Sequence, residues 1–466
     1  MAGSDYDTAA YPPGAYPQSH PDRLAAIGML LGMDAPPIDG CRVLEIGCGD
    51  GSNLIPMAVG LPRSTFFGID LATAPIERGR VLIAAAGLKN VRLEPMNLLE
   101  FPADSGAFDY IIAHGFYSWT PDLVRVKMWE VMADRLSANG VAYVSYNAYP
   151  AGYFRNAARD MMGFHLGVRQ TPDAERALTG REFIATLARH STGKRVWKTV
   201  LEFESERLNK RRLAVLRHDE LGDNYAPFQF SDVAAAADAA GFQYLAEASL
   251  RRLFTPVDPP LQKALDELAP AGLIEREQYL DYLEFRSFRE SLFCRNSVSL
   301  EREGAGRRMS KAWLASPLCK SGNQFRDSRS NGAMETNDPA VIGLLERLSA
   351  IWPSAERFED LPGDSGIGQL VSAGLVDLRT HPLVPLRVAG RIPVASPLAR
   401  AQFAVGTRAT NLLHGTVEMV DAGARRTICR LDGTQTLRSL ERLFAGAPGG
   451  VDAALGQLYR HGLLLY

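Results

Sequence analysis

The stretch that decides the fold is Val43-Leu44-Glu45-Ile46-Gly47-Cys48-Gly49-Asp50-Gly51. Its apolar first half predicts a short strand over Arg42–Ile46, and a helix is expected to begin near Ser52 or Asn53. Three glycines at alternate positions join the two elements, because the backbone must turn sharply there and approach a ligand closely. The first N–H groups of the helix are free to meet polar ligand atoms. The stretch therefore predicts a strand–turn–helix unit that holds a small molecule.

The spacing of these glycines departs from the dinucleotide-binding fingerprint. That fingerprint, Gly-x-Gly-x-x-Gly, would need its third glycine at the position of Ser52. Glycine stands at Gly51 instead, and the acid Glu45 precedes the first glycine by two residues. Asp70 ends the next predicted strand about twenty residues on, where a carboxylate can accept both hydroxyls of a ribose. The pattern therefore keeps a ribose-binding acid without the dinucleotide spacing.

Strands alternate with helices along the first part of the chain, which is typical of βαβ units with a parallel sheet. The further strands are predicted at Thr65–Ile69, Val91–Pro95, Phe108–Ala113 and Val141–Tyr146, with helices such as Ala74–Ala86 and Pro121–Leu136 between them. We therefore expect an α/β, Rossmann-like sheet.

Ligands of such sheets lie at the carboxyl ends of the strands, which makes the residues that follow each strand candidates for a site. Asn97 and Leu98 follow the third strand and are candidates for holding an adenine. His114 follows the fourth strand, where a general base, a cofactor contact and a structural role all remain open. Trp119 either walls a substrate pocket, together with Tyr117, or packs beneath the next helix.

The second half of the chain predicts two further regions. Residues 151–300 are expected to be a helical insertion and a regulatory segment, with strands at Phe242–Ala248 and Ser291–Leu300. These strands either complete the sheet or belong to a separate domain at about 215–300. Residues 301–339 contain few apolar residues and predict a linker or long loop. Residues 340–466 predict helix, helix and short strand twice, an α+β pattern typical of winged-helix units.

Composition and charge exclude several function classes. The net charge is −2, which gives no global attraction to nucleic acid, and no basic recognition helix is visible. The five cysteines are scattered without metal-ligand spacing, so no metal site is expected. No apolar run approaches the ~18 residues of a membrane span, and the N-terminal residues lack the pattern of a secretory signal. We therefore expect no membrane insertion and a cytoplasmic location.

The glycine pattern Glu-x-Gly-x-Gly-x-Gly resembles that of class I S-adenosylmethionine-dependent methyltransferases. The motifs His114–Trp119, Ser145–Pro150, Asn224–Phe228 and Phe288–Cys294 are similar to one branch, the methyltransferases that carry a methyltransferase regulatory domain. Members of that branch include rickettsial protein-lysine methyltransferases. The stretch Leu431–Leu437 also resembles small winged-helix domains that recognise peptides; a structural or dimerising winged helix is the alternative.

The resemblance implies S-adenosylmethionine as the cofactor, and residues 1–150 are expected to be the core that binds it, with the aromatic leader before the first strand as a lid. The expected cofactor contacts are Tyr16, His20, Glu45, Gly47, Cys48, Gly49, Gly51, Asn53, Asp70, Leu71, Asn97, Leu98, His114 and Gly115. The expected acceptor contacts are Tyr117, Trp119, Tyr146 and Asn147, and the candidates for a catalytic role are His114 and Tyr16. Asn97 stands where many methyltransferases place Asp against the adenine, although an amide oxygen can also accept that bond.

The resemblance also sets the expected reaction, the N-methylation of a lysine in a protein or peptide. A small-molecule methyltransferase of natural-product biosynthesis is one alternative, and a non-catalytic regulator that binds S-adenosylmethionine is another. The expected partner is thus a methyl acceptor, either a protein or peptide or a small molecule. A homodimer is a further expectation.

Overall fold

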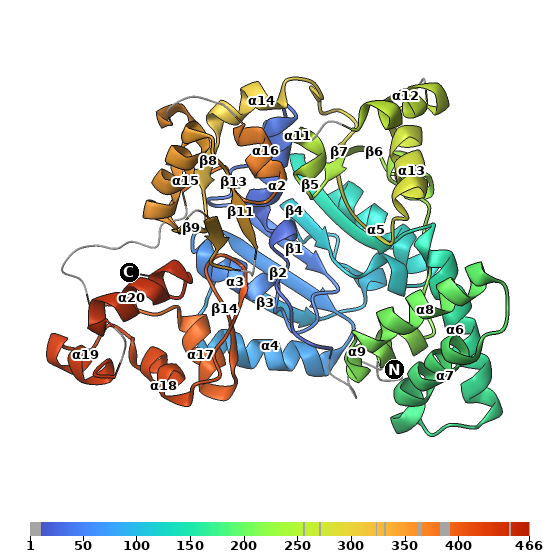
Figure 1. Cartoon of the computed structure of the whole chain (residues 1–466), viewed down its shortest axis with the longest axis horizontal. Helices are drawn as coiled ribbons and strands as arrows, with labels where there is room; N and C mark the ends of the chain where they lie inside the picture. Colours follow the sequence, from blue (N-terminus) through green and yellow to red (C-terminus); the bar gives the residue numbers. More distant parts are fainter. Residues whose placement is uncertain are drawn as a thin grey trace.

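The computed structural model describes residues 11–254, 257–269, 272–322, 324–329, 332–361, 366–382, 392–446 and 449–465. Figure 1 shows a central sheet, with helices α6–α9 at one end of the molecule and helices α17–α20 at the other.

The central sheet has seven strands in the order β3-β2-β1-β4-β5-β7-β6. Its strands are β1 (Arg42–Ile46), β2 (Thr65–Asp70), β3 (Val91–Pro95), β4 (Phe108–Ala113), β5 (Leu136–Asn147), β6 (Phe242–Glu247) and β7 (Phe288–Arg295). The first five are parallel, and β7 lies antiparallel between β5 and β6. The predicted Rossmann-like α/β sheet is confirmed, and β6 and β7 lie in this same sheet.

Both faces of the sheet are buried, and alternate residues of each strand point to opposite faces. Val43 belongs to one hydrophobic core and Leu44 to the other. The first core includes α2 (Pro21–Leu30), α3 (Leu54–Gly60) and α4 (Thr73–Ala85). The second includes α5 (Asp122–Arg135) and α10 (Phe230–Ala239), with α13 (Leu273–Glu284) packed on α10. The helices therefore hold the carboxyl ends of the strands in a fixed arrangement.

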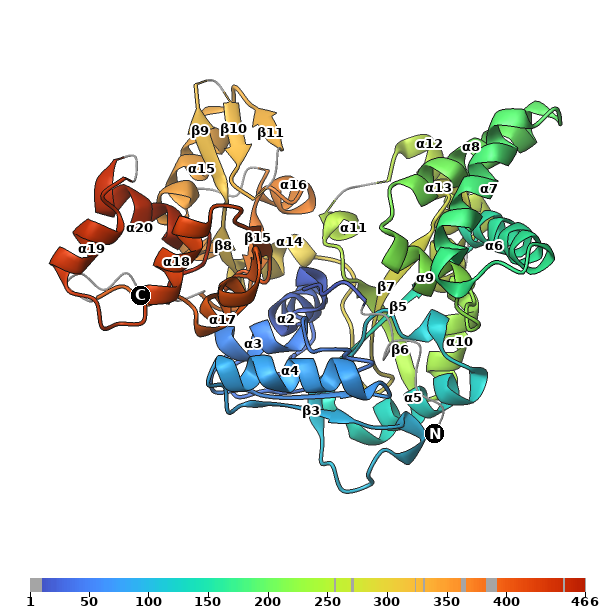
Figure 2. The ribbon, with the colours of Figure 1, turned by 90° about the horizontal axis from the view of Figure 1, so that it is seen from below.

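Four helices lie between β5 and α10 and form a separate bundle. They are α6 (Ala151–Val168), α7 (Arg176–His190), α8 (Arg195–Asn209) and α9 (Leu213–Leu221). Their own small core is built around Met162, Leu166, Ile184 and Leu208, all of which are buried. The bundle therefore projects from the sheet, as Figure 2 shows.

Two helices precede the strand that was expected at Ser291–Leu300. They are α12 (Pro259–Leu268) and then α13, which ends because Phe285 adopts the left-handed conformation with φ 53°. Strand β7 starts only three residues later and pairs Phe288 with Asn147 of β5. It therefore runs over 288–295 and not over the expected 291–300.

The expectation of a linker or long loop at 301–339 is wrong, because this segment is folded. It contains α14 (Ala305–Arg308), β8 (Trp313–Ala315), β9 (Leu318–Ser321), β10 (Gln324–Asp327) and β11 (Ala333–Glu335). Its few apolar side chains, among them Leu314, Leu318 and Phe325, are buried in the core that covers the first face of the central sheet. The segment has few apolar side chains, but it is folded because most of them are buried in this one core.

Residues 339–382 continue this packed region. They form α15 (Pro339–Ile351), β12 (Glu356–Arg357), α16 (Ile367–Ser372) and β13 (Asp377–Arg379). Strands β12 and β13 both pair with β8, in the order β12-β8-β13. Leu344, Leu345 and Leu370 belong to the same core as the sheet face. This region therefore shares a core with the sheet instead of forming a unit that packs by itself.

Residues 392–465, which we call the C-terminal unit, have their own core around Phe403, Ile428, Leu431 and Leu463. The unit contains α17 (Pro397–Val405), β14 (Arg408–Thr410), β15 (Thr416–Glu418), α18 (Ala422–Arg430), α19 (Leu437–Leu443) and α20 (Gly450–Arg460). The expected last strand is reduced to a single bridge between Ala395 and Leu464, and Tyr466 lies outside the described residues. The winged-helix assignment stays a prediction.

Candidate active site

A cavity of about 980 Å³ opens at the carboxyl ends of the parallel strands, at the upper end of the size range of ligand pockets. The glycine loop after β1, the ends of β2 and β4, the leader and the helical bundle all contribute to its wall. The expected site residues that line it are Tyr16, Glu45, Gly47, Cys48, Gly49, Asn53, Asp70, Leu71, Asn97, Leu98, His114, Gly115, Trp119 and Asn147. The topology thus brings most of the expected site together.

The glycine loop is shaped so that one glycine leaves room for a ligand. Gly49 has φ +56°, and a Cβ added to it would meet nothing within 4 Å, although Gly49 lines the cavity. At Gly51 the same Cβ would lie 2.8 Å from a Leu93 methyl group. Gly49 is therefore the position where the backbone approaches a ligand, and Gly51 is required by packing.

Asp70 ends β2 beside this loop and is held by two backbone groups. The N–H of Gly49 donates to Asp70 Oδ2 at 2.8 Å, and the N–H of Ala72 donates to Oδ1 at 2.8 Å. The carboxylate is thereby fixed beside the glycine loop, where carboxylate oxygens can accept from the hydroxyls of a ribose. The same bonds fix the glycine loop to the end of β2.

Glu45 is a buried acid with an unsatisfied oxygen. Its Oε1 accepts a hydrogen bond from Asn53 Nδ2 at 2.7 Å, whereas its Oε2 is buried and has no partner among the described residues. Burial raises the pKa of Glu45 to about 8, and the bond from Asn53 opposes this shift. Because a buried, unsatisfied acceptor is costly, Oε2 fits a donor supplied by a ligand, such as an ammonium group.

Apolar and amide groups follow β2 and β3 on the opposite wall. Leu71 is 61% exposed although it is a large apolar side chain, and Leu98 is buried beside it in the cavity wall. Asn97 Oδ1 caps the short helix that follows by accepting from the N–H of Leu99 at 3.1 Å. These groups fit the flat, mostly apolar surface of a purine.

His114 lies at the end of β4, stacked on Tyr16 with 3.6 Å between the ring centroids. Its Nδ1 is 2.9 Å from the hydroxyl of Tyr143, which donates in turn to Glu290 Oε1 at 3.1 Å. Because the Tyr143 hydroxyl donates its proton to Glu290, its oxygen must accept the hydrogen bond from His114, so the proton of the neutral ring is on Nδ1. The lone pair of the ring is therefore on Nε2. Burial lowers the pKa of His114 to about 4, so the ring is neutral near pH 7 and its Nε2 is unprotonated.

The remaining wall comes from the helical bundle and the segments after it, which sequence reasoning had not placed in the site. The additional lining residues are Arg155, Phe203, Glu204, Arg207, Asp219, Asn224, Tyr225 and Phe288. Arg155 lies over the rings of Trp119 and Tyr225, at 5.3 and 4.5 Å from their centroids. The motif at Asn224–Phe228 was visible in the sequence, but nothing in the spacing showed that it would reach the cavity.

One charged network, centred on Glu220, holds these helices in place. Arg155 pairs with Glu220 at 3.0 Å, and Arg207 pairs with Glu204 and Glu220 at 2.7 Å each. Arg155 Nη1 also donates to Asn147 Oδ1 at 2.7 Å. Burial raises the pKa of Asp219. This wall thus carries aromatic rings and carboxylates, and two of its arginines, Arg155 and Arg207, pair with Glu220.

Four expected site residues do not line the cavity. Gly51 packs on Leu93, as described above. His20 is half-buried at the start of α2, where its Nδ1 caps the helix by accepting from the N–H of Asp22 at 3.2 Å. Tyr117 and Tyr146 are buried in the second core, packed on each other at 5.9 Å between ring centroids. Their aromatic character reflects core packing, and position at a strand end could not distinguish this from a site.

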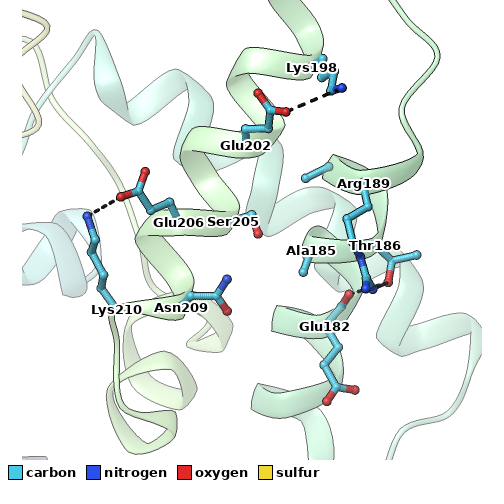
Figure 3. Close-up of a pocket in the computed structure, with 11 residues that line it drawn as sticks. Glu182, Ala185, Thr186, Arg189, Lys198, Glu202, Ser205, Glu206, Asn209 and Lys210 are labelled. Atoms are coloured by element: carbon cyan, nitrogen blue, oxygen red, sulfur yellow. Dashed lines mark hydrogen bonds and ion pairs between the residues drawn. The ribbon is translucent and has the colours of Figure 1, made fainter.

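A second hollow of about 850 Å³ lies between α7 and α8, away from the glycine loop (Figure 3). Its charged groups pair locally: Lys210 with Glu206 at 2.7 Å and Lys198 with Glu202 at 3.9 Å. Figure 3 shows these pairs along one helix.

Within the residues that the structure describes, no group of three or more His, Cys, Asp or Glu side chains could hold a metal ion. The same residues include no helix that is both long and apolar enough to cross a bilayer.

Two family models match the chain. Residues 43–140 match the family described as "Methyltransferase domain", and residues 213–295 match "Predicted methyltransferase regulatory domain". These matches confirm the resemblance stated from the motifs. The second match includes α9, which contributes Asp219 to the cavity wall.

Relatives and solved structures agree with these matches. An uncharacterized protein of Rickettsia prowazekii is 34% identical over 64% of the chain, and one of Synechocystis is 25% identical over 62%. The chain spans only 54% and 58% of these two proteins, about half of their length. The structure of PKMT2 from Rickettsia typhi covers 98% of this chain and 100% of its own, with a TM-score of 0.82 and 22% identity; that protein was also solved in complex with AdoHcy. The likeness establishes the fold along nearly the whole chain.

Proposed function

We propose that this chain, which carries a methyltransferase domain followed by a methyltransferase regulatory domain, is an S-adenosylmethionine-dependent methyltransferase. The observation that carries the proposal is the combination of three features at one cavity. Gly49 leaves open space, the Asp70 carboxylate is fixed beside it by the N–H of Gly49, and Glu45 Oε2 is buried without a partner among the described residues. These features suit the ribose and the ammonium group of the cofactor.

The residues around the cavity divide into three tasks. Asp70 would hold the ribose, Glu45 the ammonium group, and Leu71, Asn97 and Leu98 the adenine. When bound, S-adenosylmethionine supplies a methyl group activated by its sulfonium. The leader residues Tyr11–Gly14 and Tyr16 line the cavity, and they would exclude water from it.

An amine acceptor must lose a proton before it attacks a methyl group, and His114 is placed to take that proton. Its ring is neutral, and the hydrogen bond to Tyr143 leaves Nε2 as the acceptor. The proton would pass to Nε2, while Tyr143 and Glu290 keep the ring in this tautomer. Tyr16 holds the ring plane by stacking. His114 would thus act as the general base.

We propose a lysine side chain of a protein or peptide as the acceptor. The lining of the cavity includes the rings of Trp119, Tyr225 and Phe288 and the carboxylates of Glu204 and Asp219. Aromatic faces and carboxylates are the groups that recognise an alkylammonium chain. The fold shared with PKMT2 from Rickettsia typhi supports the same class of acceptor.

We also propose a cytoplasmic location for the protein. Its five cysteines are all free, which agrees with a reducing compartment.

The test is transfer of a radiolabelled methyl group from S-adenosylmethionine to the components of a bacterial lysate. The proposal expects label in protein, recovered as methyl-lysine after acid hydrolysis, and no label with a Gly49→Val control. Label confined to small molecules would replace lysine by a small-molecule acceptor. Binding of the cofactor without transfer to any fraction would replace the enzyme by a regulator that binds it.

A further inference from the structure

The turn between β14 and β15 reaches from the C-terminal unit into the methyltransferase domain. It carries His414 at its tip, in the left-handed conformation with φ 58°. The His414 ring is buried, and its Nε2 lies 2.8 Å from Asn53 Oδ1. Asn53 directly follows the glycine loop and lines the cavity. A residue 361 positions away in the chain thus contacts the candidate cofactor site from behind.

Asn53 connects this histidine to the acid that faces the cavity. Its Oδ1 also accepts from the N–H of Tyr16 at 2.9 Å, so this atom is the acceptor and Nε2 of His414 must donate. The Nδ2 of Asn53 donates to Glu45 Oε1 at 2.7 Å and to Ser19 Oγ at 3.0 Å. With its amide oriented in this way, Asn53 fixes the carboxylate of Glu45 and the leader together.

His414 is held firmly enough to act on Asn53. The side chain of Asn411 accepts from the N–H groups of Leu413 and Gly415, at 3.1 and 2.7 Å. It also donates to the carbonyl of His461 at 2.8 Å, which ties the turn to the end of α20. Helix α17 packs on α3 and α4, the helices that follow the glycine loop and β2 (Figure 2). The turn is therefore braced by the C-terminal unit on one side and by the sheet helices on the other.

The protonation state of His414 follows from its surroundings. Its Nδ1 is buried without a partner among the described residues, so a second proton there would have no acceptor. The groups that face the ring are Asn53 and His20, whose ring lies 5.4 Å away between centroids. Burial, with the nearby His20, lowers the pKa of His414. The ring is thus a neutral donor with one proton, on Nε2.

We propose that His414 is a positioning residue for cofactor binding, through which the C-terminal unit sets the orientation of Asn53 and Glu45. The inference rests on the proposed function, because it takes S-adenosylmethionine as the ligand of Glu45. Without the donor from His414, Asn53 Oδ1 keeps only the bonds from the leader, so the amide is held less firmly and the bond that directs the second oxygen of Glu45 at the ligand weakens. By linkage, ligand at Glu45 stabilises the docking of the C-terminal unit to the same extent.

The experiment compares His414→Phe with His414→Gln in the full chain. Phenylalanine keeps the ring volume and removes the donor, whereas glutamine keeps an N–H donor. We expect His414→Phe to raise the Kd for S-adenosylhomocysteine and the KM for S-adenosylmethionine about tenfold, the size expected for one lost hydrogen bond. The kcat of His414→Phe at saturating cofactor should stay within about twofold of the wild-type value. The Kd of His414→Gln should stay within about threefold of the wild-type value. His190→Phe, at an exposed histidine at the end of α7 that does not line the cavity, is the matched control and should bind as the wild type.

The outcomes separate this inference from the proposed function. If the wild-type chain does not bind S-adenosylhomocysteine, the proposed function fails, and this is read from the wild type alone. If the wild type binds and His414→Phe binds equally well, the inference is wrong. It is also wrong if His414→Phe and His414→Gln lower kcat and raise Kd alike, because that pattern indicates only a structural role. Slower amide hydrogen exchange at residues 408–418 on adding the ligand to the wild type would support the coupling, and unchanged exchange would contradict it.

Discussion

Glu45 combines two properties that seldom occur together in a carboxyl group. It is almost completely buried, and one of its oxygens has no partner among the described residues. Burial raises the pKa to about 8, so the ligand-free chain holds a proton on Glu45 at pH 7. A cationic ligand needs the ionised form, and its binding therefore releases this proton.

The first prediction is a pH dependence of cofactor binding set by Glu45. The affinity for S-adenosylhomocysteine should rise about tenfold per pH unit from pH 6 to about 8, and then level off. Glu45→Gln cannot ionise, so it should bind more weakly at pH 8 and lose this slope. Calorimetric titrations at pH 6, 7 and 8, in two buffers of different ionisation enthalpy, measure both affinity and proton release. A flat profile in the wild type would contradict the assignment.

Glu45 affects the stability of the ligand-free protein in the opposite direction to its effect on ligand binding: a higher pH favours binding but lowers the free energy of unfolding. Its folded-state pKa of about 8 exceeds the ordinary value of 4.5, so the folded chain binds more protons than the unfolded chain between these two values. The free energy of unfolding of the ligand-free protein should therefore fall as the pH rises from 4.5 to 8. Glu45→Gln should reduce that fall, which urea unfolding at several pH values measures.

The second prediction concerns His114 as the general base. Replacing it by phenylalanine should lower kcat by about 10²–10⁴-fold, the usual contribution of proton transfer. The Kd for the cofactor should change only a few-fold. Tyr143→Phe removes the bond that fixes the tautomer and should give an intermediate loss. Because the pKa of His114 is about 4, it becomes protonated only as the pH falls toward that value. A kcat for His114→Phe within threefold of the wild type would argue against this role.

Helix α2 shows how a single element joins distant parts of the chain. It begins at Pro21, directly after the leader, and its Asp22 is buried. Asp22 Oδ1 accepts from the backbone N–H and the hydroxyl of Thr380, at 2.8 and 2.6 Å. Burial alone would raise the pKa of Asp22, but the neighbouring His381 ring and the hydrogen bonds from Thr380 hold it at about 2. The element that carries the leader is thus fixed by residues far along the chain.

The third prediction follows from this bond. Asp22→Asn should lower the free energy of unfolding at pH 7 by about 2 kcal/mol, from the difference between a pKa of about 2 and the ordinary 3.8. A carboxyl group with a lowered pKa stabilises above its unfolded value, so the advantage of the wild type should shrink as the pH falls from about 4 to 2. Asp34→Asn, at an exposed acid just after α2, is the control. Equal stabilities of Asp22→Asn and wild type at pH 7 would refute this.

The elements that could be predicted from the sequence are those with a clear period and a local stop signal. Strands β1 to β4 ended where glycine, aspartate or proline signals predicted, within about one residue. Strand β7 was displaced by several residues because its start is fixed by the left-handed Phe285 and by pairing with β5, neither of which the local pattern shows. The segment at 301–339 was misread because its few apolar residues are buried only through contacts with the distant sheet face.

The candidate site divides in the same way. Gly49, Asp70 and Glu45 could be predicted because the chemistry of a glycine loop needs those residue types at that spacing. Asp219 and Tyr225 could not, since they reach the cavity only through the packing of the helical bundle on the sheet. His20 was expected in the site as part of the leader, but its ring packs against that of His414, whereas the ring of Tyr16 stacks on His114.

At the scale of the whole molecule, one hydrophobic core joins the first helix to the C-terminal region. It runs from Leu24 on α2 through the sheet to Leu344, Leu370 and Leu398. Trp352, fully buried, donates from Nε1 to the carbonyl of Arg460 at 2.8 Å and ties α15 to α20. The regions after residue 300 are therefore part of the support of the active site.

The fourth prediction is that two truncations behave differently. Removing residues 336–466 deletes at least three buried leucines of the shared core, each worth about 2–5 kcal/mol, and should prevent stable folding. Removing residues 392–466 deletes a unit with its own core, so the remainder should still fold, with a lower Tm. It should bind S-adenosylhomocysteine about tenfold more weakly because His414 is gone. Thermal unfolding followed by calorimetry measures both; an unchanged Tm and affinity in the longer deletion would contradict the shared core.

The central claim, that the cavity at the glycine loop holds the cofactor, is tested most directly by calorimetric titration of the full chain with S-adenosylhomocysteine. We predict saturable binding of one ligand per chain. Gly49→Val should abolish it by filling the open space beside the loop, and Asp70→Ala should weaken it at least tenfold because charge-assisted bonds to two hydroxyls are lost. Both variants must first show a Tm near that of the wild type. No binding by the wild-type chain, or undiminished binding by both folded variants, would contradict the claim.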